Sequence, residues 1–309
     1  MNFSFIVPLY NEQKTIKACL DAIQAEMSEN DEIIVVDNGS RDDSAEIVRR
    51  YSAVRLLMRP GINVGAVRNE GATLAKNELL AFIDADCVLC PGWRKHIASV
   101  FGALSVGATG SKCDVSKNAG WMETAWFSQR KKAPGITNYI NSGNLVVKKE
   151  AFFAAGGFDK SLISGEDAAL CWRLRELGFT IFENPQARAI HLGNPKNLCA
   201  FYRQQKWHGM GMLATFKISW VDKPLIMTNA FLVCILLAFA CLFLPGRTWS
   251  LRIAVAVLLL FGVPVLTAVY RVMTCRNFRY FPQLVILYFV YYTARLHALF
   301  SIFSPRLGR

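Results

Sequence analysis

The stretch Leu79-Leu80-Ala81-Phe82-Ile83-Asp84-Ala85-Asp86 decides the fold of this 309-residue chain. Its first five residues are apolar, which is typical of a strand buried on both faces of a sheet. Two carboxylates with one residue between them follow at its C-terminal edge. In open α/β sheets ligands bind beyond the carboxyl ends of the strands, so these acids are placed to meet a divalent cation that holds a diphosphate. Asp-x-Asp alone is a weak signal, and its position after a strand gives it weight.

The composition changes sharply along the chain. All 23 acidic residues lie at or before Asp222, and residues 223–309 contain none. Three apolar segments stand out in this tail, at about 225–244, 252–270 and 281–303. Each is near the roughly 20 residues needed to cross a bilayer core, so we expect transmembrane helices. A buried helical core is the alternative, and the acid-free flanks disfavour it.

These observations predict three regions. A soluble domain is expected at 1–195, in two halves at about 1–115 and about 116–195, which the family resemblance described below makes the donor half and the acceptor half. An amphipathic, interfacial helical segment is expected at 196–222. The membrane domain follows at 223–309, with two to three hydrophobic helices.

The net charge of +12 does not indicate nucleic-acid binding. Residues 224–309 contribute eight Arg and no acid, which leaves 12 − 8 = +4 on the rest of the chain. Arg beside apolar segments is explained by the positive-inside bias and by anionic headgroups. Nine Cys show no framework spacing, and Cys87-x-x-Cys90 lacks a second pair, so a disulfide scaffold, zinc or redox role is not favoured. We expect a reducing compartment for the globular part and no signal peptide ahead of the first strand.

Apolar runs and turn residues alternate through the first 90 residues. Strands are expected at 3–7, 33–36 and 54–58 before the Leu79 strand, with helices between them. Parallel neighbours need such helical crossovers, so a doubly wound, mainly parallel sheet is predicted. Pro8 is expected to end the first strand. A dinucleotide-binding site would need the pattern G-x-G-x-x-G directly after the first strand, where this chain lacks it. A similar pattern begins at Gly209 but follows no predicted strand, so a dinucleotide site is not expected.

Six motifs in this order resemble a family 2 glycosyltransferase with a GT-A fold, over roughly residues 3–210. They are Val7-Pro8-Leu9-Tyr10-Asn11-Glu12, Val36-Asp37-Asn38-Gly39-Ser40, Asn63-Val64-Gly65 with Arg68-Asn69, Asp84-Ala85-Asp86, Gly156-Gly157-Phe158-Asp159 and Gly165-Glu166-Asp167. The resemblance implies an α/β GT-A fold followed by C-terminal transmembrane helices. It also implies an inverting, hexosyltransferase-type enzyme (EC 2.4) that uses Mn²⁺ or Mg²⁺. The donor would be a nucleotide diphosphate sugar, with a UDP-sugar favoured.

The resemblance assigns roles in the donor half. Asp86 would be a direct metal ligand, and Asp84 would meet the ribose or complete the site. Asp37 would accept an N–H from the base edge, and Glu12 would lie near the nucleoside. Arg68 resembles a phosphate contact, with a surface helix Arg as the alternative. The remaining residues expected to bind the donor are Pro8, Tyr10, Asn11 and Ser40.

His191 follows a predicted strand at 187–190 and matches the His that completes the metal site in some GT-A enzymes. A lone His is more often structural, so both interpretations stay open. Glu166 and Asp167 precede a helix expected at 168–177, whose N-terminal dipole favours carboxylates, and capping is the alternative. The resemblance implies that Asp167 is the general base and that Glu166 assists it by positioning.

The expected acceptor-binding residues are Asn144, in a strand predicted at 141–148, and Trp207. The segment 201–207 is similar to the Gln-x-x-Arg-Trp motif of processive synthases, but Arg203 and Lys206 replace its Gln and Arg. Processive polymerisation is therefore not expected. Trp207 would stack on an acceptor sugar or belong to an amphipathic helix on the membrane.

Basic residues near the apolar segments favour a cytoplasmic enzyme domain on a multi-pass protein of the cell inner (plasma) membrane. They are Lys217, Lys223, Arg247, Arg252, Arg271, Arg276 and Arg279. The third segment contains Arg295 and His297, which are costly in lipid, so it spans the membrane or lies partly in the interface. A membrane-tethered site suits a lipid-linked acceptor or a cell-envelope glycan precursor.

Two other functions stay open. A polyprenyl-phosphate sugar transferase would share the donor half and differ in its acceptor. A non-catalytic nucleotide-binding membrane protein is disfavoured by the acids at 37, 84, 86 and 167.

Overall fold

The computed structural model describes residues 1–103, 106–127, 133–211, 223–243 and 248–303. The chain forms two compact units. The first holds Met1–Lys117 and Lys131–Asn194, and the second holds Asn118–Arg130 and Pro195–Arg309. Of the described residues, 118–127 group with the second unit.

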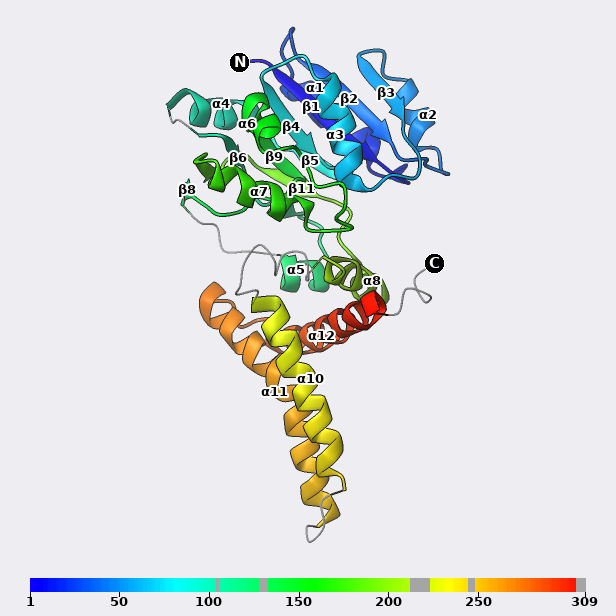
Figure 1. The fold of residues 1–309 in the computed structure, drawn as a ribbon, viewed down its shortest axis with the longest axis vertical. Helices are drawn as coiled ribbons and strands as arrows, with labels where there is room; N and C mark the ends of the chain where they lie inside the picture. Colours follow the sequence, from blue (N-terminus) through cyan, green and yellow to red (C-terminus); the bar gives the residue numbers. More distant parts are fainter. Residues whose placement is uncertain (104–105, 128–132, 212–222, 244–247, 304–309) are drawn as a thin grey trace. The chain divides into compact units, whose positions relative to one another are not determined.

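The first unit alternates short strands with helices (Figure 1). Its strands are β1 (Phe3–Leu9), β2 (Glu32–Asp37), β3 (Val54–Met58), β4 (Leu79–Ile83), β5 (Cys87–Leu89), β6 (Ala108–Gly110), β7 (Asp114–Val115), β8 (Gly135–Ile136), β9 (Asn144–Lys148), β10 (Ile181–Glu183) and β11 (Ala189–His191). Its helices are α1 (Ile16–Glu26), α2 (Ser44–Arg49), α3 (Val64–Leu74), α4 (Trp93–Ala103), α6 (Lys149–Ala154) and α7 (Glu166–Glu176).

Eight strands form one sheet in the order β3-β2-β1-β4-β9-β6-β10-β8. β3, β2, β1 and β4 pair in parallel, β9 is antiparallel to both β4 and β6, and β10 is parallel to β6. The mixed α/β architecture with a mainly parallel sheet, expected from the sequence, is confirmed. A smaller sheet of three strands has the order β5-β11-β7.

β1 lies at the centre of the donor half and contributes to the core on both faces of the sheet. Phe3, Phe5 and Val7 are fully buried in a cluster that includes residues of α1, α2 and α4. Ile6 points to the opposite face, where α3, α6 and α7 pack. Because both faces are covered, β1 and its neighbours are apolar runs, which is why the period-2 alternation of a half-buried strand is missing.

Pro8 does not end the first strand, as the sequence had suggested, and β1 continues to Leu9. Pairing with β4 stops at Ile6, while pairing with β2 continues to Leu9. The Leu9 carbonyl accepts from the Asn38 backbone N–H beyond the end of β2. The backbone groups of Pro8 therefore face the opposite side of β1, where the pairing with β4 has already ended. A proline is tolerated there because no ladder hydrogen bond is lost.

The second unit is helical. Its helices are α5 (Trp121–Phe127), α8 (Leu198–Gly209), α10 (Lys223–Cys241), α11 (Trp249–Cys275) and α12 (Phe281–Phe303). Among the described residues, three segments are long and apolar enough to cross a membrane by length and composition: Lys223–Cys241, Trp249–Cys275 and Phe281–Ser301. Within this unit α10 and α11 run side by side, whereas α12 lies across them and packs against α8 (Figure 1).

The contact between α8 and α12 includes polar side chains as well as the apolar cluster that contains Phe201 and Leu296. The Tyr202 hydroxyl lies 2.6 Å from His297 Nδ1, and Lys206 Nζ lies 3.1 Å from His297 Nε2. The Arg295 guanidinium lies over the Tyr291 ring, 4.9 Å from its centroid. The basic residues of the third apolar segment thus contact protein groups on α8 and α12, which lowers the cost of placing them near lipid.

Candidate active site

The loops after β1 and β2 are joined by hydrogen bonds. Asn11 has φ of 55°, a left-handed conformation that Asn tolerates better than most residues. Its backbone N–H donates to Ser40 Oγ at 2.9 Å, and its side-chain oxygen accepts from the Arg41 N–H at 2.8 Å. The Glu12 N–H donates to Ser44 Oγ at 2.7 Å. These contacts fix two loops at the carboxyl ends of neighbouring parallel strands, where ligands of α/β folds bind.

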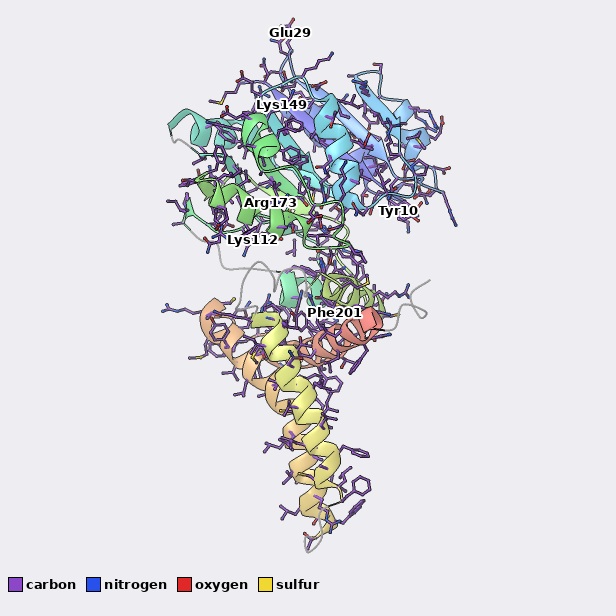
Figure 2. The ribbon with its side chains drawn as sticks, in the orientation of Figure 1. Tyr10, Glu29, Lys112, Lys149, Arg173 and Phe201 are labelled. Carbon is purple, nitrogen blue, oxygen red and sulfur yellow. The ribbon has the colours of Figure 1, made fainter. Side chains whose placement is uncertain are left out.

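Asp37 is the last residue of β2 and is fully buried. Its carboxylate accepts from the Ser40 hydroxyl at 2.5 Å and from the Ser40 backbone N–H at 3.1 Å. Ser40 therefore orients Asp37 and links it to Asn11. Tyr10, in contrast, is 54% exposed at the end of β1 (Figure 2).

Arg68 connects the two halves of the first unit. Its Nη2 lies 2.6 Å from Asp84 Oδ1, and its Nη1 lies 2.7 Å from Glu166 Oε1. Burial acts against the charge, but the two carboxylates raise the pKa of Arg68 above its ordinary value. The side chain is only 4% exposed, so the alternative of a surface helix Arg is wrong. Both terminal nitrogens are used by acids, so this geometry leaves Arg68 to hold Asp84 and Glu166 rather than to reach a phosphate directly.

Asp86 and His191 meet beside this bridge. β5 begins directly after Asp86 and pairs with β11, which places His191 in register with Cys87. His191 Nε2 lies 3.3 Å from Asp86 Oδ2. Burial raises the pKa of Asp86, and His191 opposes this shift. Carboxylate and imidazole converge here as two ligands would around one divalent cation.

Two neighbours complete the surroundings of Asp86. A Cβ added to Gly193 would lie 1.9 Å from Asp86 Oδ2, so only glycine fits at that position. Burial raises the pKa of Glu12, the hydrogen bond from Thr15 opposes it, and the charge of Asp86 raises it further. Glu12 is therefore electrostatically part of the same acidic site.

Asp167 lies in the first turn of α7, which begins at Glu166 rather than at 168 as expected. Gly165 precedes the helix with φ of 84°. Asp167 Oδ2 accepts from the Tyr139 hydroxyl at 2.8 Å, and Oδ1 accepts from the Ala168 N–H at 2.8 Å. Burial raises the pKa of Asp167, and the bond from Tyr139 opposes this. Of these two neighbouring carboxylates, Glu166 pairs with Arg68. Among the contacts of the described residues, Asp167 has no ion-pair partner at hydrogen-bond distance.

The two residues expected to bind the acceptor are placed differently. Asn144 is fully buried, and its amide accepts from Trp93 Nε1 at 2.7 Å and donates to Ser111 Oγ and the Ala187 carbonyl at 2.9 Å. Its polar atoms are used inside the fold, so the structure contradicts direct acceptor contact by Asn144. Trp207 is 40% exposed on α8 in the second unit.

Sequence reasoning missed Tyr139 and Gly193, and it considered Cys87 only within the Cys87-x-x-Cys90 pattern, for which a metal role was not favoured. Tyr139 had no motif around it, and only the fold brings it to Asp167. Cys87 directly follows Asp86, and Gly193 is two residues after His191, so proximity to those motif residues was the available signal.

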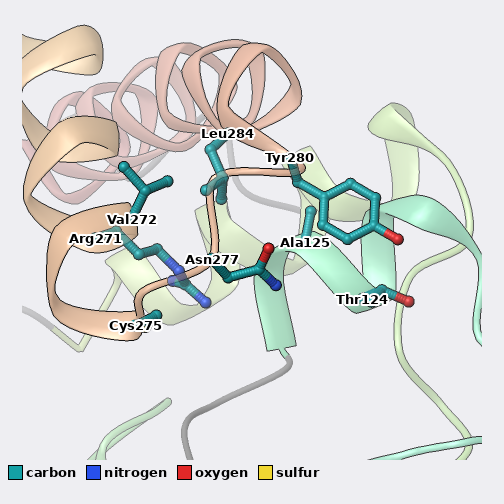
Figure 3. A pocket seen from close by; sticks show the side chains of 8 residues that line it. All are labelled: Thr124, Ala125, Arg271, Val272, Cys275, Asn277, Tyr280 and Leu284. Carbon is teal, nitrogen blue, oxygen red and sulfur yellow. The ribbon is translucent and has the colours of Figure 1, made fainter.

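Two cavities lie away from these residues. One, of about 20 Å³, has room for about one water molecule and belongs to the second unit (Figure 3). Its lining residues are Thr124, Ala125, Arg271, Val272, Cys275, Asn277, Tyr280 and Leu284. The other, of about 880 Å³, lies at the amino end of β1 and β4, beside Met1, Leu79 and Lys149. Neither is lined by a predicted site residue.

A mainly parallel α/β sheet with acids at the carboxyl ends of its strands defines the class of proteins that bind nucleotides at that edge. The sequence model of glycosyl transferase family 2 matches residues 4–154. Residues 4–154 thus match this family of transferases, and the first unit has the GT-A fold.

Curated relatives match much of the chain. It is 29% identical over 190 residues to glycosyltransferase AglE of Haloferax volcanii, covering 58% of this chain and 62% of that protein. It is 28% identical over 240 residues to the pre-mycofactocin glycosyltransferase of Mycobacterium tuberculosis, covering 72% of this chain and 50% of that protein. The matches thus span half to three fifths of the length of these relatives.

One solved structure with this fold is the mannosyltransferase PcManGT from Pyrobaculum calidifontis in complex with GDP-Man and Mn²⁺. The TM-score is 0.60 at 17% identity, over 97% of this chain and 86% of that one. At this identity the likeness shows the fold alone.

Proposed function

We propose that this chain is a membrane-associated inverting glycosyltransferase that moves a sugar from a nucleotide diphosphate sugar to an acceptor by direct displacement. One observation carries the proposal. Arg68 joins Asp84, which follows β4, to Glu166, at the start of α7, with separations of 2.6 and 2.7 Å. This bridge supports one proposed site, built from both halves of the first unit, that includes the Asp86–His191 pair and Asp167.

The donor is proposed to bind along the loops after β1 and β2. Asp37, oriented by Ser40, accepts an N–H of the base, and Pro8, Tyr10, Asn11 and Glu12 line the nucleoside. A UDP-sugar is the proposed donor. The named relatives and the GDP-Man and Mn²⁺ in the PcManGT structure support a nucleotide-sugar donor and a divalent metal in general terms.

The residues around Asp86 fit a divalent cation. Asp86 Oδ2 and His191 Nε2 converge at 3.3 Å, and Gly193 leaves space where any side chain would collide with the carboxylate. Asp86 and His191 would hold Mn²⁺ or Mg²⁺, which supplies positive charge for the departing diphosphate. Asp84 stays fixed by Arg68 beside them.

Asp167 is proposed to take the proton from the acceptor hydroxyl as that oxygen attacks the anomeric carbon. Its pKa is raised by burial, which makes it a stronger base than an exposed Asp. Tyr139 and the Ala168 N–H fix its orientation. Glu166, held by Arg68, acts as a positioning residue rather than as the base.

The acceptor is proposed to be lipid-linked or a cell-envelope glycan precursor, at the inner (plasma) membrane with the first unit in the cytoplasm. Three apolar helices support membrane association. Trp207, 40% exposed on α8, is the candidate that stacks on an acceptor sugar. The domain boundaries at 195 and 222, suggested by composition, stay predictions.

A polyprenyl phosphate acceptor is the second candidate. Among the described residues of the second unit Glu123 is the single acid, and Lys196 pairs with it. Lys206 and Arg295 on α8 and α12 therefore lie in a unit with an excess of positive charge, which favours an anionic lipid. Extraction of radiolabelled product into organic solvent, followed by mild acid, separates this acceptor from a glycan because a sugar phosphate bond is acid-labile.

The test of donor and metal binding uses thermal unfolding of the full chain in detergent with a panel of nucleotide sugars, with and without Mn²⁺. A ligand at about 100 times its Kd stabilises by about 2.7 kcal/mol, so a matching donor raises the melting temperature. Asp86→Asn should remove the Mn²⁺-dependent part of that shift because it keeps the size and removes the charge. Asp21→Asn, on the exposed face of α1, is the matched control. Undiminished Mn²⁺-dependent binding in Asp86→Asn would contradict the metal assignment.

A further inference from the structure

Cys87 follows Asp86 and lies opposite His191 in the small sheet. β5 and β11 are antiparallel, and Cys87 and His191 are direct cross-strand partners. Such partners carry their side chains on the same face, with Cβ atoms about 4.5–5.5 Å apart. The strand pairing therefore brings a thiol to the Asp86–His191 pair, and the ligand atoms of Asp86, Cys87 and His191 all lie within 4.8 Å of one another.

The separations of the ligand atoms are near those of a tetrahedral metal site, although His191 and Cys87 face different carboxylate oxygens of Asp86. Zn²⁺ binds N and O ligands at about 2.0–2.1 Å and S ligands at about 2.3 Å, so tetrahedral N···O and S···O edges are about 3.3 and 3.5 Å. In the structure His191 Nε2 lies 3.3 Å from Asp86 Oδ2, and Cys87 Sγ lies 3.8 Å from Asp86 Oδ1. Small side-chain movements would bring all three onto one ion.

A second thiol lies next to the first. Cys113 Sγ is 3.7 Å from Cys87 Sγ, close to the S···S edge of about 3.8 Å expected between two thiolates on one Zn²⁺. Cys113 precedes β7, which pairs with the other side of β11 and places Val115 in register with His191. Both neighbours of β11 thus deliver a cysteine to this place, and Cys90 of the Cys-x-x-Cys pattern is not one of them.

We propose that Asp86, Cys87 and His191 form a site for thiophilic divalent cations such as Zn²⁺ or Cd²⁺, with the thiol of Cys113 beside that of Cys87. This metal site deepens the proposed function. It rests on that function because Asp86 and His191 are also the residues proposed to hold Mn²⁺ or Mg²⁺ for the transfer. Thiolates favour Zn²⁺ and Cd²⁺, whereas Mn²⁺ and Mg²⁺ prefer oxygen ligands. On binding, each coordinating thiol gives its proton to water.

The consequence is inhibition. Zn²⁺ held by Asp86, Cys87 and His191 would occupy the two ligands that the transfer metal uses, and thiolate ligation favours Zn²⁺ over Mn²⁺ or Mg²⁺. Zn²⁺ at this site would therefore exclude the metal that the transfer uses and switch the site off. The cysteine next to the acidic motif makes the chain sensitive to thiophilic metals.

The experiment titrates the full chain in detergent with Cd²⁺ alone, without donor or acceptor, and records the ultraviolet charge-transfer absorption of Cd²⁺-bound thiolate. Wild type and the matched control Cys90→Ser should show the band with equal affinity. Cys87→Ser should weaken Cd²⁺ binding at least about tenfold and reduce the band, whereas Mn²⁺ affinity should change by less than about threefold. Because no sugar is present, failure of the proposed transfer reaction leaves this result unaffected.

A band of full strength in Cys87→Ser, or equal loss of Mn²⁺ and Cd²⁺ affinity, would overturn the proposal. A second measurement uses the wild-type chain, so it does not depend on whether the variant folds. X-ray absorption of the chain loaded with one equivalent of Zn²⁺ should show sulfur at about 2.3 Å together with N or O at about 2.0–2.1 Å. Coordination by N and O alone would overturn the proposal as well.

Discussion

At the scale of single residues, two adjacent carboxylates at the start of α7 have different surroundings. Glu166 is 6% exposed in its side chain and paired with Arg68, whereas Asp167 faces the Tyr139 hydroxyl. Burial raises the pKa of both carboxylates. The main influence that opposes this shift is the charge of Arg68 for Glu166 and the hydrogen bond from Tyr139 for Asp167. A base needs a carboxylate that can accept a proton without breaking an ion pair, which favours Asp167.

Asp167→Asn should therefore reduce transfer by about 10²–10⁴-fold, the usual contribution of a positioned base, with donor and metal affinity nearly unchanged. The base must be ionised, and burial places its pKa above the ordinary 3.8, so wild-type transfer should fall as the pH decreases through that raised value. The acidic limb should be absent from the residual activity of the variant. Steady-state kinetics across pH would check both points.

Glu166→Gln is the matched comparison and should act more weakly, through positioning. The charged form of Asp167 is disfavoured by burial, so the Asp167→Asn chain is expected to keep its fold. Turnover within a factor of a few of wild type, or loss of donor binding at unchanged fold, would assign the base to Glu166 or Asp159 instead.

Arg68 gives a stability prediction. Arg68→Met leaves two buried or partly buried carboxylates without their cation, and breaking such a pair costs about 3–5 kcal/mol. Arg59 pairs with Glu70 at 3.1 Å, but both side chains are at least 40% exposed, so Arg59→Met should cost at most about 1 kcal/mol. Thermal unfolding of the two variants should show a much larger decrease for Arg68→Met, and equal decreases would mean that water already compensates the buried acids.

The sequence placed the acids correctly but could not give their partners. Asp84, Asp86 and Asp37 follow apolar runs, so their place at strand ends could be predicted from local pattern alone. The Arg68–Glu166 pair joins residues 98 positions apart, and the bonds of Asn144 reach Trp93, Ser111 and Ala187. Such contacts depend on tertiary packing, so the sequence could not show that the polar atoms of Arg68 and Asn144 are used inside the fold.

At the scale of elements, the strands were easier to predict than their ends. β3 runs over Val54–Met58 as expected, because turn residues flank it on both sides. α7 begins two residues earlier than expected, since Gly165 in a left-handed conformation starts the helix before the acids. β6, β7, β8 and β10 have two or three residues each, too few for a hydrophobic period to be recognised.

The packing of α3 on the sheet makes a second stability prediction. A Cβ added to Gly71 of α3 would lie 2.5 Å from Ile6 Cγ2 on β1, so Gly71→Ala should force the helix away from the strand. Overpacking of this kind costs about 1–3 kcal/mol, more than the up to about 1 kcal/mol that alanine gains over glycine in a helix. The shift should also reduce donor affinity, because α3 carries Arg68.

Gly102 in α4 is the control. Its added Cβ would meet only the Met1 side-chain end at 3.8 Å, an ordinary contact, so Gly102→Ala should keep or raise stability. Unfolding of both variants, followed by circular dichroism, gives the comparison. A stable Gly71→Ala with unchanged donor affinity would show that the α3–β1 contact can relax without effect on the site.

At the scale of the whole molecule, composition identified the membrane part but not which short helices belong with it. The apolar segments expected at 225–244, 252–270 and 281–303 correspond to α10, α11 and α12. α5, however, interrupts the first unit in sequence and packs in the second, where Trp126 contacts Phe201, Tyr288 and Tyr291 through its ring. A seven-residue helix of mixed character carries no sequence signal for such a partner.

The last prediction concerns the orientation of the second unit in the membrane. α10 ends at Cys241 and α11 begins at Trp249, so Thr248 lies between the first two candidate spans, and Asn277 follows α11. Arg271, Arg276 and Arg279 surround Asn277, and basic residues favour the cytoplasmic side. In a parent chain with Cys241 and Cys275 replaced by serine, Thr248→Cys should react with a membrane-impermeant maleimide on intact cells. Asn277→Cys should react only after permeabilisation.

Both positions are exposed within the unit, so accessibility depends on the membrane rather than on packing. The reverse pattern would place the first unit outside the cytoplasm and away from nucleotide sugars, whereas labelling of both positions on intact cells would mean that α11 does not cross the bilayer.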